Sequence, residues 1–258
     1  MRYVKGSIVL NSVNDHVVLR HVLRSRHVSH EQLWQFLQLN GQVWPRRTLN
    51  WRIQRLVEHG LIIRSDLSVV SGVRVYRISD RGASYLIGKG ESAALMIGSK
   101  GNSADESAIQ HSLDINDIHL AMLRTKQLVS WQCESEIRSQ NEFTGVGFAK
   151  DYDAIVTVNT NGRDVRFALE YERTPKPPKR YWQIRELIEK EKHVECILYL
   201  TSTFHLLSYV SRFFERSVKA VYFGILDEFR LHNLETKVMD SRRTVTFPLS
   251  SVLQGRTR

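Results

Sequence analysis

The chain has 258 residues, a formal net charge of +10 and a sequence pI near 9.7. At roughly 100–200 residues per domain, this length favours two domains, and a composition of 42% hydrophobic and 25% charged residues is typical of globular domains. The excess of Lys and Arg favours a polyanionic partner, although charge alone does not separate DNA from RNA or an anionic membrane.

Two classes of segment are missing from the sequence. It has no run of about 18 apolar residues, and its first residues, MRYVKGSIVLNSVNDH, hold no apolar stretch long enough for a signal peptide. We therefore expect a cytoplasmic protein with no membrane partner. Cys133 and Cys196 are isolated in sequence, which predicts reduced, buried thiols and not a metal knuckle.

A change of composition divides the chain. Residues 88–108, GKGESAALMIGSKGNSADESA, are rich in Gly, Ser and Ala and contain no aromatic residue. This composition predicts a flexible linker over residues 89–108. The linker would separate a first domain at residues 1–88 from a second domain at residues 109–258.

Capping signals mark the first two helices of the first domain. Asn14 or Asp15 is suited to cap a helix that ends near Leu23. Ser29 is expected to cap the second helix, and Gln32, three positions later, is its expected capping-box partner.

A third helix is predicted over residues 45–59. Leu49, Ile53 and Leu56 recur there with helical spacing and form the inward face. The outer face is left to Arg46, Arg47, Asn50, Trp51, Gln54 and Arg55. Apart from Trp51, which is more typical of packing, these residue types donate hydrogen bonds to phosphates and to guanine or adenine edges.

A hairpin follows the third helix. Its strand-like runs are residues 61–64 and 73–78, and its expected tip is at Ser71-Gly72. Arg74 and Arg77 come directly after the tip, where such a wing can grip the DNA backbone beside the helix.

A short helix capped by Ser79 completes the order helix, helix, helix, hairpin, helix. With the segments RLVEHGLI and ISDRGASYL at its end, this order resembles the winged helix family. The resemblance implies a winged helix-turn-helix that binds double-stranded DNA. Two other interpretations stay open, because a basic amphipathic helix is often a solvated face and some winged domains bind proteins.

The second domain is predicted to be a mixed sheet flanked by helices, because its elements follow the order α-β-β-β-α-β-α-β. The predicted helices are residues 109–128, 181–192 and 204–216, and the predicted strands are residues 129–138, 152–158, 165–171, 194–201 and 220–225.

Three carboxylates stand out in these strands. Asp153 precedes an apolar run, and Glu170 and Glu172 are two positions apart, so they share one face of a strand. Such a cluster needs a cation, and hard oxygen ligands suit Mg²⁺ or Mn²⁺, which can activate water. The alternative is that the acids form surface ion pairs with nearby arginines, namely Arg166, Arg173 and Arg180.

The arrangement resembles the PD-(D/E)XK nuclease superfamily, whose core runs α-β-β-β-α-β. The resemblance implies that Asp153 is the first acid and Glu170 the second, 17 positions later. Glu172 stands where the family usually has Lys, so Lys176 or Lys179 is the candidate for the missing positive charge.

The segment HSLDINDIHLAML (residues 111–123) and the acid-bearing strands after it resemble the replication-relaxation family, which combines an N-terminal winged helix with a domain like this one. This resemblance implies a protein of plasmids and integrated mobile elements that acts in replication or its control. It also implies that the Glu-x-Glu pair is usual in the family. His111 and His119 are expected to pack against the sheet and not to bind metal.

Three functions therefore stay open from the sequence. The first is a sequence-directed DNA-binding regulator of replication or transcription. The second is a DNA endonuclease in which Asp153, Glu170 and Glu172 are catalytic and hold Mg²⁺ or Mn²⁺. The third is an adaptor for replication or transposition proteins. A homodimer is compatible with each, since the apolar segment FHLLSYVSRFF (residues 204–214) can supply an interface, although the same segment can equally belong to the core.

Overall fold

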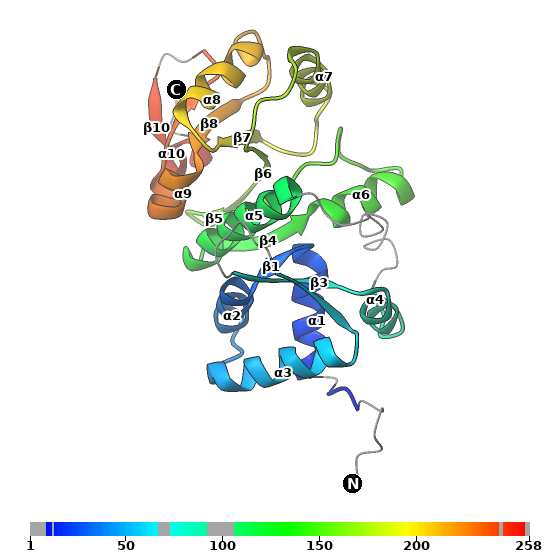
Figure 1. Ribbon diagram of the computed structural model, residues 1–258. Coiled ribbons are helices and arrows are strands. Elements are labelled where there is room, and N and C mark those ends of the chain that lie inside the picture. Colours follow the sequence, from blue (N-terminus) through cyan, green and yellow to red (C-terminus); the bar gives the residue numbers. More distant parts are fainter. Residues whose placement is uncertain (1–8, 12, 67–72, 92–105, 243–244, 256–258) are drawn as a thin grey trace. The chain divides into compact units, whose positions relative to one another are not determined.

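The computed structural model describes residues 9–11, 13–66, 73–91, 106–242 and 245–255 (Figure 1). Contacts within the chain group it into two units, residues 1–116 and 117–258. The division falls inside helix α5 (Glu106–Arg124), whereas the sequence analysis placed a linker at residues 89–108, most of which lie outside the described ranges. Within those ranges, no helix has the length and hydropathy needed to cross a lipid bilayer.

Unit 1 is a winged helix-turn-helix, as predicted. Its elements before α5 are α1 (Asn14–Ser25), β1 (Val28–Ser29), α2 (His30–Leu39), α3 (Arg46–Glu58), β2 (Ile62–Asp66), β3 (Arg74–Ile78) and α4 (Asp80–Ile87). The strands form an antiparallel sheet in the order β1-β3-β2. The expected hairpin tip at Ser71-Gly72 lies outside the described residues.

Side-chain caps explain where two of these helices begin. The Ser29 side chain accepts a hydrogen bond from the Gln32 N–H (3.1 Å), and the Gln32 side chain accepts one from the Ser29 N–H (3.2 Å), which confirms the predicted capping box. Ser79 caps α4 by accepting from the Gly82 N–H (3.0 Å). These bonds satisfy amides that the first helical turn leaves unpaired.

The first turn of α1 differs from the prediction. Asn11 Oδ1 accepts from the N–H of Asn14 (2.8 Å), so the amide is satisfied from outside the helix. Asp15, expected as a possible cap, is instead fully buried inside the first turn. Its carboxylate is used in a tertiary contact described below.

The first half of α5 packs within unit 1. Ile109 and Leu113 are buried in one cluster with Val75 of β3. The Asn116 side chain donates to the carbonyl oxygen of His27 (2.7 Å). This apolar and polar attachment explains why the helix begins in unit 1 although the sequence assigned it to the second domain.

Unit 2 is built around one mixed sheet. Its elements after α5 are β4 (Leu128–Cys133), α6 (Glu134–Phe143), β5 (Ala154–Thr160), β6 (Arg163–Glu172), α7 (Pro178–Glu189), β7 (Cys196–Thr201), α8 (Phe204–Ser211), η2 (Arg212–Phe214), β8 (Val221–Ile225), α9 (Leu226–His232), η3 (Asn233–Glu235), β9 (Lys237–Asp240), β10 (Thr246–Pro248) and α10 (Leu249–Leu253). The strand order is β10-β9-β8-β7-β6-β5-β4. Strands β6, β7 and β8 run parallel, and the other neighbours are antiparallel.

The order α5-β4-β5-β6-α7-β7 matches the predicted restriction-endonuclease-like core, with α6 inserted between β4 and β5. The predicted strand at residues 129–138 is therefore wrong beyond Cys133. Glu136 accepts from the Cys133 N–H (2.9 Å) and closes a capping box. Arg138 pairs with Glu134 one turn away, which further favours a helix over a strand.

Helices α6, α7 and α8 cover one face of the sheet (Figure 1). On this face Ile155, Ala168 and Ile197 are paired across β5, β6 and β7 and are buried together with side chains of the three helices. Every residue of β7 is buried, which is typical of a central strand of a parallel sheet. Cys133 and Cys196 are buried and neither takes part in a disulfide within the described residues, as predicted.

Candidate functional site

Helix α3 separates an apolar face from a polar one. Leu49, Ile53 and Leu56 are buried, and this face pins the helix to unit 1. The opposite face exposes Arg46, Arg47, Asn50, Trp51 and Gln54. Trp51 is 56% exposed, so it does not serve as a core residue.

His30 joins the exposed face of α3 to the wing strand. One ring nitrogen, Nε2, lies 2.8 Å from Asn50 Oδ1, and the other, Nδ1, lies 3.1 Å from the Tyr76 hydroxyl of β3. Burial is the largest influence on the imidazole and lowers its pKa, so the neutral ring prevails at pH 7. With Oδ1 engaged by His30, the Asn50 amide N–H₂ remains available as a donor.

Other polar side chains of α3 are held by local contacts. The Arg46 guanidinium pairs with Glu31 and lies 4.6 Å from the ring centroid of Trp34. Gln54 donates to Glu58 (2.9 Å). Arg47 has no hydrogen-bond or ion-pair partner among the described residues, so it can turn toward a ligand at little cost.

Arg55 does not lie on the open face that the sequence predicted. Its guanidinium pairs with the buried carboxylate of Asp15, which also pairs with Arg52 at 2.9 Å. Arg55 also lies over the Trp51 ring, 4.9 Å from its centroid. Because the side chains of Arg52 and Arg55 are only 14% and 12% exposed, we assign Arg55 to fixing α3 on α1.

The wing strand β3 carries the other two predicted contacts. Arg74 is exposed, whereas Arg77 is half-buried. Arg74 pairs in register with Asp66 of β2 at the end of the described hairpin. The two arginines are three positions apart on one strand, so their side chains project from opposite faces of it.

Positive charge is concentrated in this part of the chain. Residues 1–88 hold 13 Lys and Arg against five Asp and Glu, a net charge of +8. The remaining 170 residues carry only +2 of the chain's +10. The winged helix therefore accounts for most of the attraction to a polyanion that the composition indicates.

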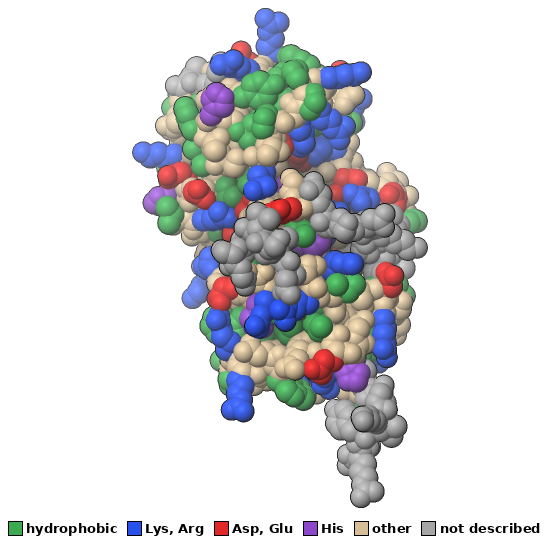
Figure 2. Space-filling model, viewed as in Figure 1, with side chains coloured by type: hydrophobic (Ala, Val, Ile, Leu, Met, Phe, Trp, Pro, Cys, Tyr) green, Lys and Arg blue, Asp and Glu red, His purple; other side chains and the backbone are tan. Residues whose placement is uncertain are grey.

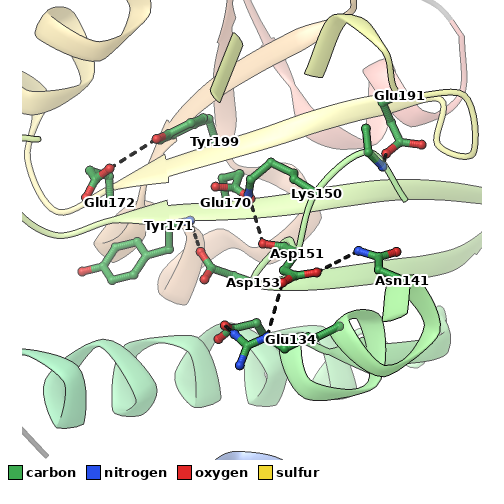
Figure 3. A network of polar contacts seen from close by, with 12 residues as sticks. Glu134, Asn141, Lys150, Asp151, Asp153, Glu170, Tyr171, Glu172, Glu191 and Tyr199 are labelled. Carbon is green, nitrogen blue, oxygen red and sulfur yellow. Dashed lines mark hydrogen bonds and ion pairs between the residues drawn. The ribbon is translucent and has the colours of Figure 1, made fainter. Parts of the chain in front are cut away.

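The three predicted carboxylates lie near one end of β5 and β6 (Figure 3). Asp153 immediately precedes β5, and Glu170 and Glu172 end β6. Glu170 pairs in register with Tyr199, and Glu172 with Thr201, on the face covered by α6, α7 and α8. The prediction that both glutamates share one face is confirmed.

Glu170 is neutralised by a lysine that the sequence analysis did not single out. The Lys150 ammonium pairs with the Glu170 carboxylate and lies 4.6 Å from the ring centroid of Tyr152. Burial raises the pKa of Glu170 to about 7, with Lys150 opposing and the nearby Asp153 adding to the rise. The side chains of Lys150 and Glu170 are only 13% and 7% exposed, so the pair is shielded from water.

The loop before β5 holds Lys150 in place. Asp151 accepts from the Asn141 side chain (2.8 Å), and the buried Glu191 accepts from the Ala149 N–H (2.9 Å). The Asn141, Asp151 and Glu191 side chains that take part in these contacts are labelled in Figure 3. The sequence signal that could have identified Lys150 is the segment AKDYDA, which places this lysine three residues before Asp153.

Glu172 has its own cation and a hydroxyl partner. The Lys176 ammonium lies 2.8 Å from Glu172 Oε2, and the Tyr199 hydroxyl donates to the same oxygen (3.3 Å). Burial raises the pKa of Glu172, and Lys176 opposes that rise. Of the two lysines that the nuclease resemblance offered, Lys176 therefore pairs with Glu172.

The three carboxylates do not form a metal site in this arrangement. Asp153 accepts from the Tyr171 N–H (2.7 Å), while Glu170 and Glu172 are paired with lysines. Across the described ranges, no group of three or more His, Cys, Asp or Glu side chains is placed to hold a metal ion. In this arrangement the ammonium groups of Lys150 and Lys176 balance the charges of Glu170 and Glu172, and the cluster on Mg²⁺ or Mn²⁺ stays a prediction.

Comparison with models of protein families and with curated proteins finds no match to this sequence. Among solved structures, the restriction endonuclease FokI is similar at 13% identity over 84% of this chain and 42% of that chain, with a TM-score of 0.28. The same endonuclease bound to DNA matches at 12% identity over 84% and 43%, also with a TM-score of 0.28. The chain spans less than half of that endonuclease, and a match at this TM-score gives no information about activity.

Proposed function

We propose that the protein binds double-stranded DNA through unit 1, with α3 in the major groove. The observation that carries this proposal is the two-faced helix α3. Leu49, Ile53 and Leu56 fix one face, and the opposite face presents Arg47, Asn50 and other hydrogen-bond donors to solvent. A helix of this kind fits the major groove and reaches base edges.

The donors divide into two roles. Asn50, whose Oδ1 is engaged by His30, offers an amide suited to the N7 and N6 edge of adenine, and Arg47 suits guanine or a phosphate. Arg74 and Arg77 on the wing strand contact the backbone, which positions the helix without reading sequence. Arg46 and Gln54 complete the contact surface, and Arg55 does not belong to it because Asp15 holds it.

The process that this binding serves rests on the sequence resemblance alone. The replication-relaxation resemblance points to control of replication or transcription on a plasmid or mobile element. Association with replication or transposition proteins and homodimer formation belong to the same proposal.

Metal-dependent cleavage is not the function that the geometry favours. Glu170 and Glu172 are each neutralised by a lysine, so the carboxylates as arranged do not fit a shared divalent ion. The direct check is incubation of supercoiled plasmid with the protein and Mg²⁺ or Mn²⁺. Nicking that Asp153→Ala and Glu170→Ala abolish would restore the endonuclease interpretation.

The test of DNA binding compares two arginine-to-alanine variants, each of which removes one positive charge. Arg47→Ala is expected to weaken duplex binding about tenfold in fluorescence anisotropy, at the lower end of about 1–3 kcal/mol for a base contact. Arg163→Ala is the matched control, since Arg163 is an exposed arginine of unit 2 that pairs with Glu195. Equal losses for both variants would mean that overall charge, and not α3, holds the duplex.

A further inference from the structure

Four aromatic rings meet at the surface formed by α7, α8 and η2. Phe213 stacks on Tyr181, with centroids 4.9 Å apart and planes at 23°. Trp182 and Tyr209 each meet Phe213 edge-to-face, at 5.3 and 5.4 Å. We call Tyr181, Trp182, Tyr209 and Phe213 the aromatic platform. The rings of Tyr181 and Phe213 are buried, so the core holds the inner side of the platform in place.

Trp182 is the open member of the platform. It is 47% exposed, although one side of its indole packs against the Phe213 ring. The Arg185 guanidinium lies 5.7 Å from the indole centroid and is itself fixed by donating to the carbonyl oxygen of Arg216 (2.7 Å). An exposed indole held by a fixed arginine is preorganised to receive a flat ligand.

The platform lies in a strongly basic setting. Residues 173–186 and 204–216 together hold seven Lys and Arg against two Glu. The excess of +5 exceeds the net +2 of residues 89–258 as a whole, so the rest of that stretch is net acidic. In Figure 2 hydrophobic side chains gather over α7 and α8 with Lys and Arg at their border.

The platform also connects to the carboxylate–lysine network. The Tyr181 hydroxyl accepts from the Lys176 N–H (2.9 Å), and the Lys176 ammonium pairs with Glu172. The basic loop before α7 therefore runs between the network and the platform. A ligand that follows this loop would carry repeated negative charge past exposed Arg173, Lys179 and Arg180.

We propose that this surface of unit 2 binds unpaired bases of single-stranded nucleic acid, with a base stacked on Trp182 and the phosphates beside the basic loop and η2. Single-strand binders combine a positive track with aromatic rings on which bases stack, and any base can stack. In a duplex the neighbouring base pairs cover the faces of each base and leave only its edges accessible. We therefore do not expect a duplex to bind at this platform. The site is separate from α3 and does not depend on it.

The first test measures binding of the full chain to a labelled oligothymidylate of about 16 nucleotides, a length at the upper end of known single-strand sites. Trp182→Leu is expected to weaken binding about tenfold, whereas Trp182→Phe, which keeps a ring, stays within about threefold. Leu231→Ala removes another exposed apolar side chain of unit 2, 73% exposed in the native chain, and is expected to change nothing. Duplex affinity is unchanged in all three variants.

The second test needs no variant. An abasic strand of the same length keeps the phosphates and lacks the bases, so it is expected to bind about tenfold more weakly than oligothymidylate. Equal affinity for the two strands would overturn the proposal, as would wild-type binding by Trp182→Leu. A change in association state without a change in strand binding would identify a protein-docking surface instead and also overturn it.

Discussion

The structure separates two arginines of α3 that look equivalent in the sequence. Arg47 is exposed and pairs with no residue in the described ranges, and Arg55 is held by the buried carboxylate of Asp15. We predict that Arg55→Ala lowers the stability of unit 1 but largely spares DNA affinity, and that Arg47→Ala does the reverse. Asp15→Ala completes the set because it removes the anion that Arg52 and Arg55 share.

The magnitudes follow from what each change leaves behind. Asp15→Ala leaves two largely buried guanidinium groups without their anion, and breaking a buried pair in this way costs about 3–5 kcal/mol. Arg55→Ala leaves Asp15 paired with Arg52, so the loss is one charge-assisted hydrogen bond, about 1.5–3 kcal/mol. Arg47→Ala touches no described partner and is expected to stay within about 0.5 kcal/mol.

Urea denaturation of the full chain followed by tryptophan fluorescence measures these losses, because Trp44 and Trp51 lie over Arg52 and Arg55. Duplex affinity is measured in parallel well below the unfolding midpoint. The reasoning is refuted if Arg55→Ala unfolds like the wild type and loses DNA binding, since Arg55 would then be a DNA contact and not a tie to α1.

Two further predictions concern pH and packing. Burial raises the pKa of Glu170 from 4.5 to about 7, so between these two pH values the native state holds a proton that the unfolded state has released. The free energy of unfolding therefore falls as pH rises from 4.5 to about 7. Glu170→Gln is expected to remove this loss from denaturation midpoints measured between pH 5 and 8, and an unchanged pH profile would contradict it. At Gly82 an added Cβ would lie 2.1 Å from Leu61 O, so Gly82→Ala is expected to cost about 1–3 kcal/mol in the same assay. Gly88→Ala, where the nearest atom is 3.5 Å away, is the matched control, and equal effects would refute the packing argument.

Local signals made much of the fold predictable. The capping box of Ser29 and Gln32 and the cap at Ser79 depend on residues a few positions apart, so the sequence contains both partners in one window. The spacing of Leu49 and Ile53 likewise predicted the buried face of α3. The Asp153 and Glu170 pattern correctly marked the strand ends where the carboxylates lie.

The wrong predictions arose where the partner of a residue is distant in the sequence, or where a helix-start signal lies within a strand-like run. Arg55 looked exposed because its partner, Asp15, is 40 positions away and no local pattern connects them. Lys150 was missed for the same reason, because its partner Glu170 is 20 positions away, on β6. The strand prediction that ran past Cys133 ignored Glu136, whose place three positions on is a helix-start signal.

The central claim is that α3 touches duplex DNA, and photo-cross-linking tests it most directly. A duplex pool with 5-iodouracil in place of thymine is irradiated in complex with the full chain, and the linked peptides are identified by mass spectrometry. The account predicts cross-links within Arg46–Glu58, chiefly at the exposed Trp51. Cross-links confined to residues 117–258 would contradict it.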